Sequence, residues 1–215
     1  MTEGLPAPPW PRPLLLTARF VSWVLHPLFV GVMMMFYITF LQPTLFLAVS
    51  PQARVLKFAT FVVNNCLFPA LVVILSRALG FNSSIHLDSS RERIVPYMAS
   101  VIFFFWTWNV FRNQPESPEL LVSMCLGIFL SACAALVLNS FQKISMHAMG
   151  MGGLLGLLWV MAGTRWIPGH WMVAVAVLST GLVLTARMLV TDHTGRELAS
   201  GLFVGIAMQL IAAWL

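Results

Sequence analysis

Charged residues are scarce in this 215-residue chain: 12 Lys and Arg and 7 Asp and Glu make up only 9% of it, while 59% is hydrophobic. The mean hydropathy of +0.87 lies far outside the range of soluble domains. A soluble Rossmann or barrel enzyme and a nucleic-acid binder are excluded, because each needs a folded, water-exposed surface. The net charge of +5 reflects few acids rather than a basic domain. The composition indicates an integral membrane protein.

Cysteine is also scarce, and the N-terminus lacks the basic region of a cleaved signal peptide. Cys66, Cys125 and Cys133 fall inside apolar runs, where a thiol behaves as a small hydrophobe, so we expect neither a disulfide nor a metal cluster. The first residues are rich in proline and predict an extended polar lead over 1–19. A single transmembrane domain over 20–215 is expected to follow, with its first span retained in the mature protein.

Long apolar stretches fill most of the chain. A helical span needs about 20 apolar residues, so about seven spans leave only short connections. The breaks between the stretches contain charged, proline or turn residues. We therefore predict an all-α, polytopic transmembrane helical bundle of about six to seven spans with an active site at one membrane face. The stretches lie at 20–41, 55–79, 94–111, 120–138, 148–164, 166–186 and 198–215.

Three polar loops, 80–93, 139–147 and 187–197, are separated from one another by two spans each. They must therefore emerge on the same face of the membrane, and with seven spans the C-terminus lies on the opposite face. The positive-inside rule leaves the orientation open. The face with the three loops has eight Lys and Arg against four on the other, which taken literally places the loops in the cytoplasm. If the four cations that are candidates for anion binding are set aside, the count is four against four.

Two glycine pairs follow two of these loops. Gly152 and Gly156 share one face of the fifth predicted helix, and Gly201 and Gly205 share one face of the seventh. Small residues at this spacing allow helix backbones to approach closely in lipid. Two interpretations stay open: these two helices pack directly against each other, or each pair packs elsewhere in the bundle.

The third polar loop carries an arginine, a histidine and an acid at regular spacing. Arg187 lies six residues before His193, and Glu197 lies four residues after it. If the segment is helical, this spacing brings the Glu197 carboxylate within reach of the His193 ring. A carboxylate on one ring nitrogen fixes the tautomer and makes the other nitrogen a better nucleophile or base.

The other two loops carry groups that suit phosphate. Lys143, Ser145 and His147 stand immediately before a glycine-rich helix, where backbone N–H groups and a hydroxyl form an anion cradle. Arg91 and Arg93 in the first loop add two guanidinium groups, which suit bidentate contact with phosphate oxygens.

These residues resemble the motifs of the type-2 phosphatidic acid phosphatase superfamily of membrane lipid phosphatases. That family carries Lys, six residues, then Arg-Pro; Pro-Ser-Gly-His; and Ser-Arg, five residues, His, three residues, Asp. The third motif is matched with its spacing intact by Arg187, His193 and Glu197, and the second by Ser145 and His147.

The chain departs from the family pattern at several positions. Glu197 stands where the family has Asp, and Ala186, Ile144 and Met146 replace Ser, Pro and Gly. The first motif is the poorest match, because the proline follows Arg93 by three residues and no lysine stands seven residues before it.

The resemblance implies covalent phosphoryl transfer without a metal or cofactor. His193 would attack phosphorus, Glu197 would orient and stabilise its ring, and His147 would protonate the leaving group and then activate water. The implied substrate is a lipid phosphate whose chains stay in the bilayer, and the implied setting is a bacterial inner membrane. A homo-oligomer is left open, and Lys143 is either a phosphate ligand or an interfacial anchor. The implied phosphate-binding residues are Arg187, Arg91, Arg93 and Ser145.

Structural alternatives stay open beside this interpretation. Thr194 and Glu197 also fit a capping box for the last helix. Arg91 and Arg93 also fit a solvated ion-pair loop, and His26, next to Pro27, reads as a structural histidine. A non-catalytic relative that binds phospholipids or acts as a scaffold is the alternative function.

Overall fold

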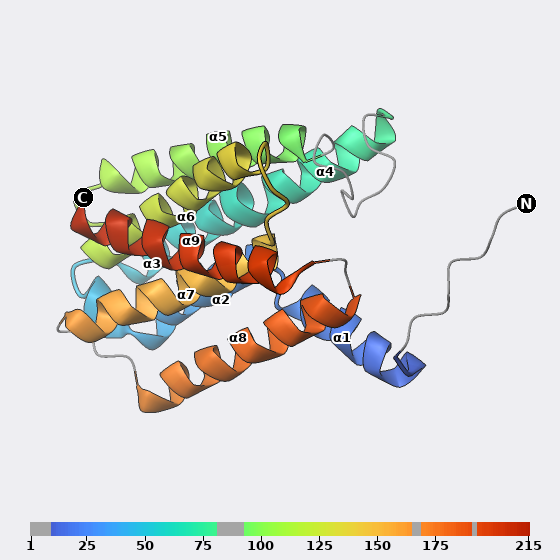
Figure 1. Ribbon diagram of the computed structural model, residues 1–215. Helices are drawn as coiled ribbons and strands as arrows, with labels where there is room; N and C mark the ends of the chain where they lie inside the picture. Colours follow the sequence, from blue (N-terminus) through green and yellow to red (C-terminus); the bar gives the residue numbers. More distant parts are fainter. Residues whose placement is uncertain (1–9, 81–92, 165–168, 191–192) are drawn as a thin grey trace, which may run out of the picture.

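The computed structural model describes residues 10–80, 93–164, 169–190 and 193–215, and over these ranges the chain is helical with no strand (Figure 1). Its continuous helical stretches include six that are long and apolar enough to cross a membrane, or seven with a bent pair at the N-terminal side. The predicted all-α bundle of six to seven spans is confirmed. The α-helices are α1 (Arg12–Val24), α2 (Pro27–Phe36), α3 (Pro51–Val62), α4 (Phe68–Ala78), α5 (Ile94–Arg112), α6 (Glu119–Leu138), α7 (Met146–Gly163), α8 (His170–Val190) and α9 (Gly195–Trp214).

The first span differs from the expectation of one straight helix over 20–41. Helix α1 already begins at Arg12, inside the predicted extended lead, because prolines are tolerated in the first turn of a helix. The α1–α2 pair is bent by 52° at the break before Pro27, whose nitrogen has no hydrogen to donate. His26 caps the new helix, since its Nδ1 accepts a hydrogen bond of 3.3 Å from the backbone N–H of Leu28.

Helices α7 and α9 pack directly against each other, as one of the two interpretations of the glycine pairs predicted. A Cβ atom added at Gly152 would collide with the carbonyl oxygen of Leu202, and one at Gly205 would collide with that of Met149. A Cβ at Gly201 would lie 2.7 Å from the carbonyl oxygen of Ser145. The seam therefore holds the beginnings of α7 and α9 together by backbone contact that only glycine permits.

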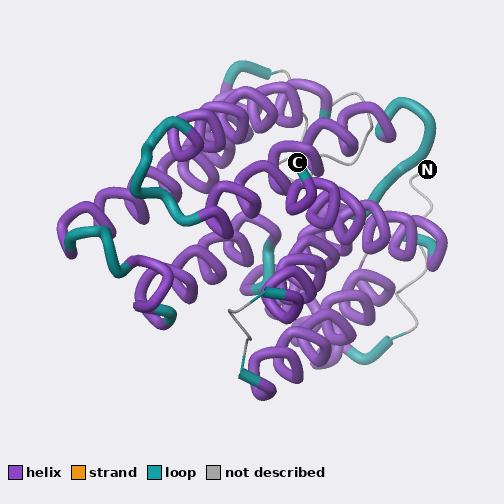
Figure 2. Tube along the Cα trace, turned by 90° about the vertical axis from the view of Figure 1, so that its left-hand side faces the viewer, coloured by secondary structure: helices purple, strands orange, loops and turns teal. Residues whose placement is uncertain are grey.

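The polar loops gather at one end of the bundle, here called the site end. Figure 1 shows that α4, α6 and α8 finish there and that α5, α7 and α9 start there, while the C-terminus lies at the opposite, far end. Figure 2 views the bundle from the side of that far end. The described parts of the three loops thus share one end, and the predicted alternation of the spans is confirmed.

The apolar core is densest toward the far end. Met35, Ile38, Phe46, Phe111 and Leu121 are completely buried in one cluster. Met35 of α2, Phe111 of α5 and Leu121 of α6 stand on the halves of these helices that point away from the polar loops. A cavity opens at the site end and extends from there into the bundle.

Candidate active site

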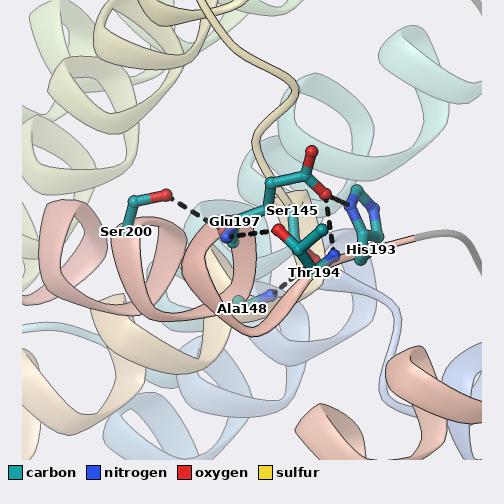
Figure 3. Close-up of polar contacts among 6 residues, drawn as sticks. All are labelled: Ser145, Ala148, His193, Thr194, Glu197 and Ser200. Carbon is teal, nitrogen blue, oxygen red and sulfur yellow. Dashed lines mark hydrogen bonds and ion pairs between the residues drawn. The ribbon is translucent and has the colours of Figure 1, made fainter.

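The histidine of the third loop is paired with its predicted carboxylate. The Nδ1 of His193 donates to the Oε2 of Glu197 over 3.0 Å, and the same oxygen accepts from the backbone N–H of Thr194, also at 3.0 Å (Figure 3). The backbone N–H of Glu197 in turn donates to the Thr194 hydroxyl, which completes a capping box for α9. The capping interpretation is therefore confirmed together with the predicted contact, because one carboxylate both caps the helix and bonds to the histidine.

His193 and Glu197 do not meet across one turn of a helix, as the spacing in the sequence had suggested. His193 lies before the N-cap residue of α9 and is not itself helical. Glu197 reaches it because, as the third residue of the helix, its side chain folds back over the first turn. Since Nδ1 carries the proton toward the carboxylate, Nε2 is left with its lone pair, as a nucleophile requires.

The surroundings of His193 favour the neutral ring. The side chain is 9% exposed, and this burial lowers its pKa below the usual 6.5. The hydrogen bond to Glu197 raises the pKa, whereas the positive charges of Arg187 and Lys143 lower it, and the net direction is downward. A neutral, oriented imidazole beside two cations matches the demands of attack on an anionic phosphate.

The predicted cations converge on one cavity. Arg187 in the last turn of α8, Arg93 just before α5, and Lys143 before α7 all line it, together with His193. Arg19 of α1 lines the same cavity and was not singled out from sequence, where it read only as part of the N-terminal lead. Arg91 lies outside the described residues.

Ser145 occupies a different position from the cations. Its side chain is completely buried, and its hydroxyl accepts a hydrogen bond of 3.4 Å from the backbone N–H of Ala148 as the N-cap of α7 (Figure 3). It does not line the cavity, although its neighbours Ile144 and Met146 do. The hydroxyl therefore orients the start of α7, and with it His147.

His147 lies in the first turn of α7 and lines the cavity. Its Nε2 is 3.0 Å from the carbonyl oxygen of Ser22 in α1. A carbonyl only accepts, so Nε2 carries the proton and Nδ1 is the ring nitrogen left for proton exchange. The bend after α1 supplies this acceptor, because helix α1 ends at Val24 and does not continue to residue 26, which would otherwise bond the Ser22 carbonyl.

His26 caps α2, as its interpretation as a structural histidine predicted, but it also belongs to the site. It lines the cavity, and its ring stands edge-on to the ring of His147 with centroids 5.1 Å apart. Its place in the cavity could have been suspected from its position directly before Pro27, because a proline breaks the helix there and changes the direction of the chain. The site thus contains three histidines, of which the motifs named two.

The cavity has a volume of about 1160 Å³ and changes in character along its length. The arginine, lysine and histidine side chains gather at the site end, whereas the walls deeper in the bundle come mostly from apolar residues of α2, α4, α5, α6 and α7. A few polar side chains, Asn65, Ser131 and Gln209 among them, also line this deeper part. In the part of the chain that the structure describes, no three His, Cys, Asp or Glu side chains form a cluster suited to a metal ion. A cationic mouth above an apolar interior is complementary to an anionic amphiphile.

Comparisons with protein-family models, with curated proteins and with solved structures find no match to this chain. Function is therefore inferred from the geometry of the site and from the motif spacing in its loops.

Proposed function

We propose that this protein is a membrane-embedded phosphatase that hydrolyses a phosphomonoester or diphosphate of a lipid through a phosphohistidine intermediate. One observation carries the proposal: the Nδ1 of His193 is bonded to Glu197 at the mouth of a cavity that Arg93, Lys143 and Arg187 also line. A nucleophile with its orienting carboxylate and a set of cations for the phosphate oxygens are the parts that covalent phosphoryl transfer needs.

The first chemical step forms a bond between His193 and phosphorus. The Nε2 lone pair attacks, the bond from phosphorus to the lipid oxygen breaks, and that oxygen takes a proton from His147. Glu197 stabilises the positive charge that develops on the His193 ring. Arg187 and Arg93 balance the negative charge that spreads over the phosphate oxygens in the transition state.

The second step returns the enzyme to its starting state. His147 takes a proton from water, the resulting hydroxide attacks phosphorus, and the bond to His193 breaks to release inorganic phosphate. The hydrogen bond from its Nε2 to the Ser22 carbonyl assigns this proton exchange to Nδ1.

The direct test is phosphate release by the purified protein in detergent with a metal chelator present. The substrates are phosphatidate, phosphatidylglycerol phosphate and an isoprenyl diphosphate, and the variants are His193→Ala and His147→Ala. His170→Ala is the matched control, because His170 begins α8 at the far end of the bundle and is exposed. Both site variants are expected to lose release by roughly 10⁴-fold, while the control keeps it.

A covalent intermediate gives a second readout. Wild-type protein quenched in base after incubation with radiolabelled lipid phosphate is expected to carry acid-labile label, and His193→Ala is expected to carry none. If no substrate releases phosphate but the protein still binds the lipid phosphate, the proposed enzyme is rejected in favour of a non-catalytic phospholipid-binding protein. Release that neither histidine affects would place the chemistry elsewhere.

A further inference from the structure

The expectation that the substrate chains remain in the bilayer does not account for the cavity below the cations. The residues of α7 that line the cavity follow one side of the helix: Met146, His147, Met149, Gly150, Gly153, Leu154 and Leu157. Ten residues of α-helix span about 15 Å, so the cavity extends about half the thickness of the hydrocarbon core below His147. Its depth greatly exceeds that of a phosphate group.

The walls of this deeper part are mostly apolar and belong to several helices, with Asn65, Ser131 and Gln209 as polar lining residues among them. Val73 and Ile74 come from α4, Phe104 from α5, Ile128 from α6 and Leu154 from α7. An ordered water needs two to four polar partners, and most of this lining supplies none, whereas apolar cavities take up apolar ligands. The filling that suits this space is therefore hydrocarbon.

The cavity also has a floor. Phe61, Met124 and Leu157 line its deep end and are at most 2% exposed, and all three belong to the cluster that fills the far half of the bundle. Protein interiors of this kind are close-packed, so the cavity does not continue past them. A chain that enters from the site end meets a defined stop.

We infer that one hydrocarbon chain of a phosphate-headed amphiphile lies inside the bundle, with its head group at Arg187 and His193 and its tail between α4, α5, α6 and α7. The inference rests on the proposed function for the position of the head group, and it names the substrate class as lipids with a flexible, unbranched or prenyl chain that threads the cavity. The charge and polarity of the cavity select the occupant, because the mouth is cationic and the interior is mostly apolar. A neutral bilayer lipid satisfies only the second condition.

Gly153 provides a way to close the cavity without disturbing the helix contacts. It lines the cavity six residues after His147, and a Cβ atom at this position would meet no atom within 4 Å. The neighbouring Gly152 and Gly156 face α9 and do not tolerate a side chain. A Phe at residue 153 is therefore expected to project into the cavity about 9 Å below His147 and to leave the α7–α9 seam intact.

The matched control is Gly181 of α8. A Cβ atom there also meets nothing within 4 Å, but Gly181 is exposed on the outside of the bundle and does not line the cavity. Gly153→Phe and Gly181→Phe thus make the same chemical change in a helix, one inside the cavity and one toward lipid. Gly153→Leu is the smaller plug in case the aromatic variant does not fold.

The experiment measures binding of hexadecyl phosphate and butyl phosphate to each protein in phosphatidylcholine nanodiscs, with phosphate release followed in parallel. Gly153→Phe is expected to weaken binding of hexadecyl phosphate by about tenfold or more, the order of effect that overfilling a packed site produces. Butyl phosphate, whose chain ends above the plug, is expected to bind with less than about a twofold change. Gly181→Phe is expected to match the wild type with both ligands.

Three results would overturn the inference. Unchanged binding of hexadecyl phosphate to Gly153→Phe places the chain in the bilayer, and equal weakening in Gly181→Phe removes the link to the cavity. Equal loss of both ligands in Gly153→Phe means that the plug acts on the head-group site. Failure of the proposed function is separate: the expected binding pattern without phosphate release from any substrate keeps the chain in the cavity and rejects the phosphatase.

Discussion

The two ends of the bundle use their positive charges differently. At the far end, Arg54 donates from Nη2 to the carbonyl oxygen of Phe46 over 2.6 Å and from Nε to that of Val49 over 3.1 Å. Lys57 is buried and donates to the side chains of Gln114 and Ser117. Arg54 and Lys57 tie two segments to α3, namely the 3₁₀ turn Pro43–Phe46 with the residues after it, and the α5–α6 connection. The far-end cations therefore have structural roles.

At the site end, the cations line a cavity instead. Arg93, Lys143 and Arg187 surround the mouth, and the helices are joined there by the glycine seam of α7 and α9. The packing follows the same division, because the far half holds the largest cluster of buried apolar side chains, whereas the site half holds smaller clusters beside the cavity. The comparison teaches that a count of Lys and Arg per membrane face combines structural cations with cations that serve a site.

The glycine seam is expected to be the most sensitive feature of the site end. Gly205→Leu would force a side chain into the carbonyl group of Met149, at a cost of about 3 kcal/mol or more, and would part α7 from α9. We expect loss of thermal stability and of phosphate release together. Gly181→Leu, which adds the same side chain on the lipid-facing side of α8, is expected to keep both. Equal tolerance of the two variants would contradict the seam.

Replacing one arginine at each end by alanine tests this difference between the two ends directly. Arg187→Ala is expected to lower phosphate release by roughly 10² to 10³-fold, because a charge-balancing donor is removed from the transition state. Arg54→Ala is expected to leave release per folded molecule unchanged and to lower the melting temperature, since two carbonyl groups lose their donor. Release assays and thermal unfolding on both variants suffice, and a comparable loss of release in Arg54→Ala would remove the distinction.

The double role of Glu197 can be separated by a pair of variants. Glu197→Gln keeps a capping side chain but removes the charge that stabilises the His193 ring, and we expect a loss of release of about 10²-fold. Thr194→Ala removes the hydroxyl cap, costs about 1 kcal/mol of stability and leaves the histidine pair in place. If Thr194→Ala lowered release as much as Glu197→Gln, the carboxylate would act through the helix start and not through its charge.

The smallest expected effect is a shift in pH dependence. Release requires neutral His193, and burial together with Arg187 and Lys143 lowers its pKa, so activity is expected to persist as the pH falls below 6.5 and to decline only below the lowered pKa. Lys143→Gln removes one lowering charge and should move the acidic limb of kcat/KM to higher pH, by less than about one pH unit. Lys57→Gln also removes one positive charge, but at the far end, and should leave the acidic limb of kcat/KM at the same pH. A shift toward lower pH in Lys143→Gln would contradict the assignment of the limb to His193.

Much of the architecture followed from the sequence alone. Expected span boundaries agree with the helices to within about four residues from the second span onward, because long apolar runs must form internally bonded helices in lipid. Alternation of the spans placed the polar loops at one end, and the i, i+4 spacing of His193 and Glu197 identified the pair that the structure joins. These features depend on local sequence and on the geometry of the membrane.

Only the tertiary structure decided how the site is completed. The bend before Pro27 presents the Ser22 carbonyl to His147 and turns His26 toward it, a contact between residues more than a hundred positions apart. The cavity arises because large side chains pack the far half, while glycines and small residues leave space between the helices nearer the site end. The sequence pattern of a single helix cannot reveal such a space, because the space is bounded by several helices. Sequence determines which residues are apolar, polar or charged along each span; the packing of the helices decides which of those residues face one another and which face a cavity.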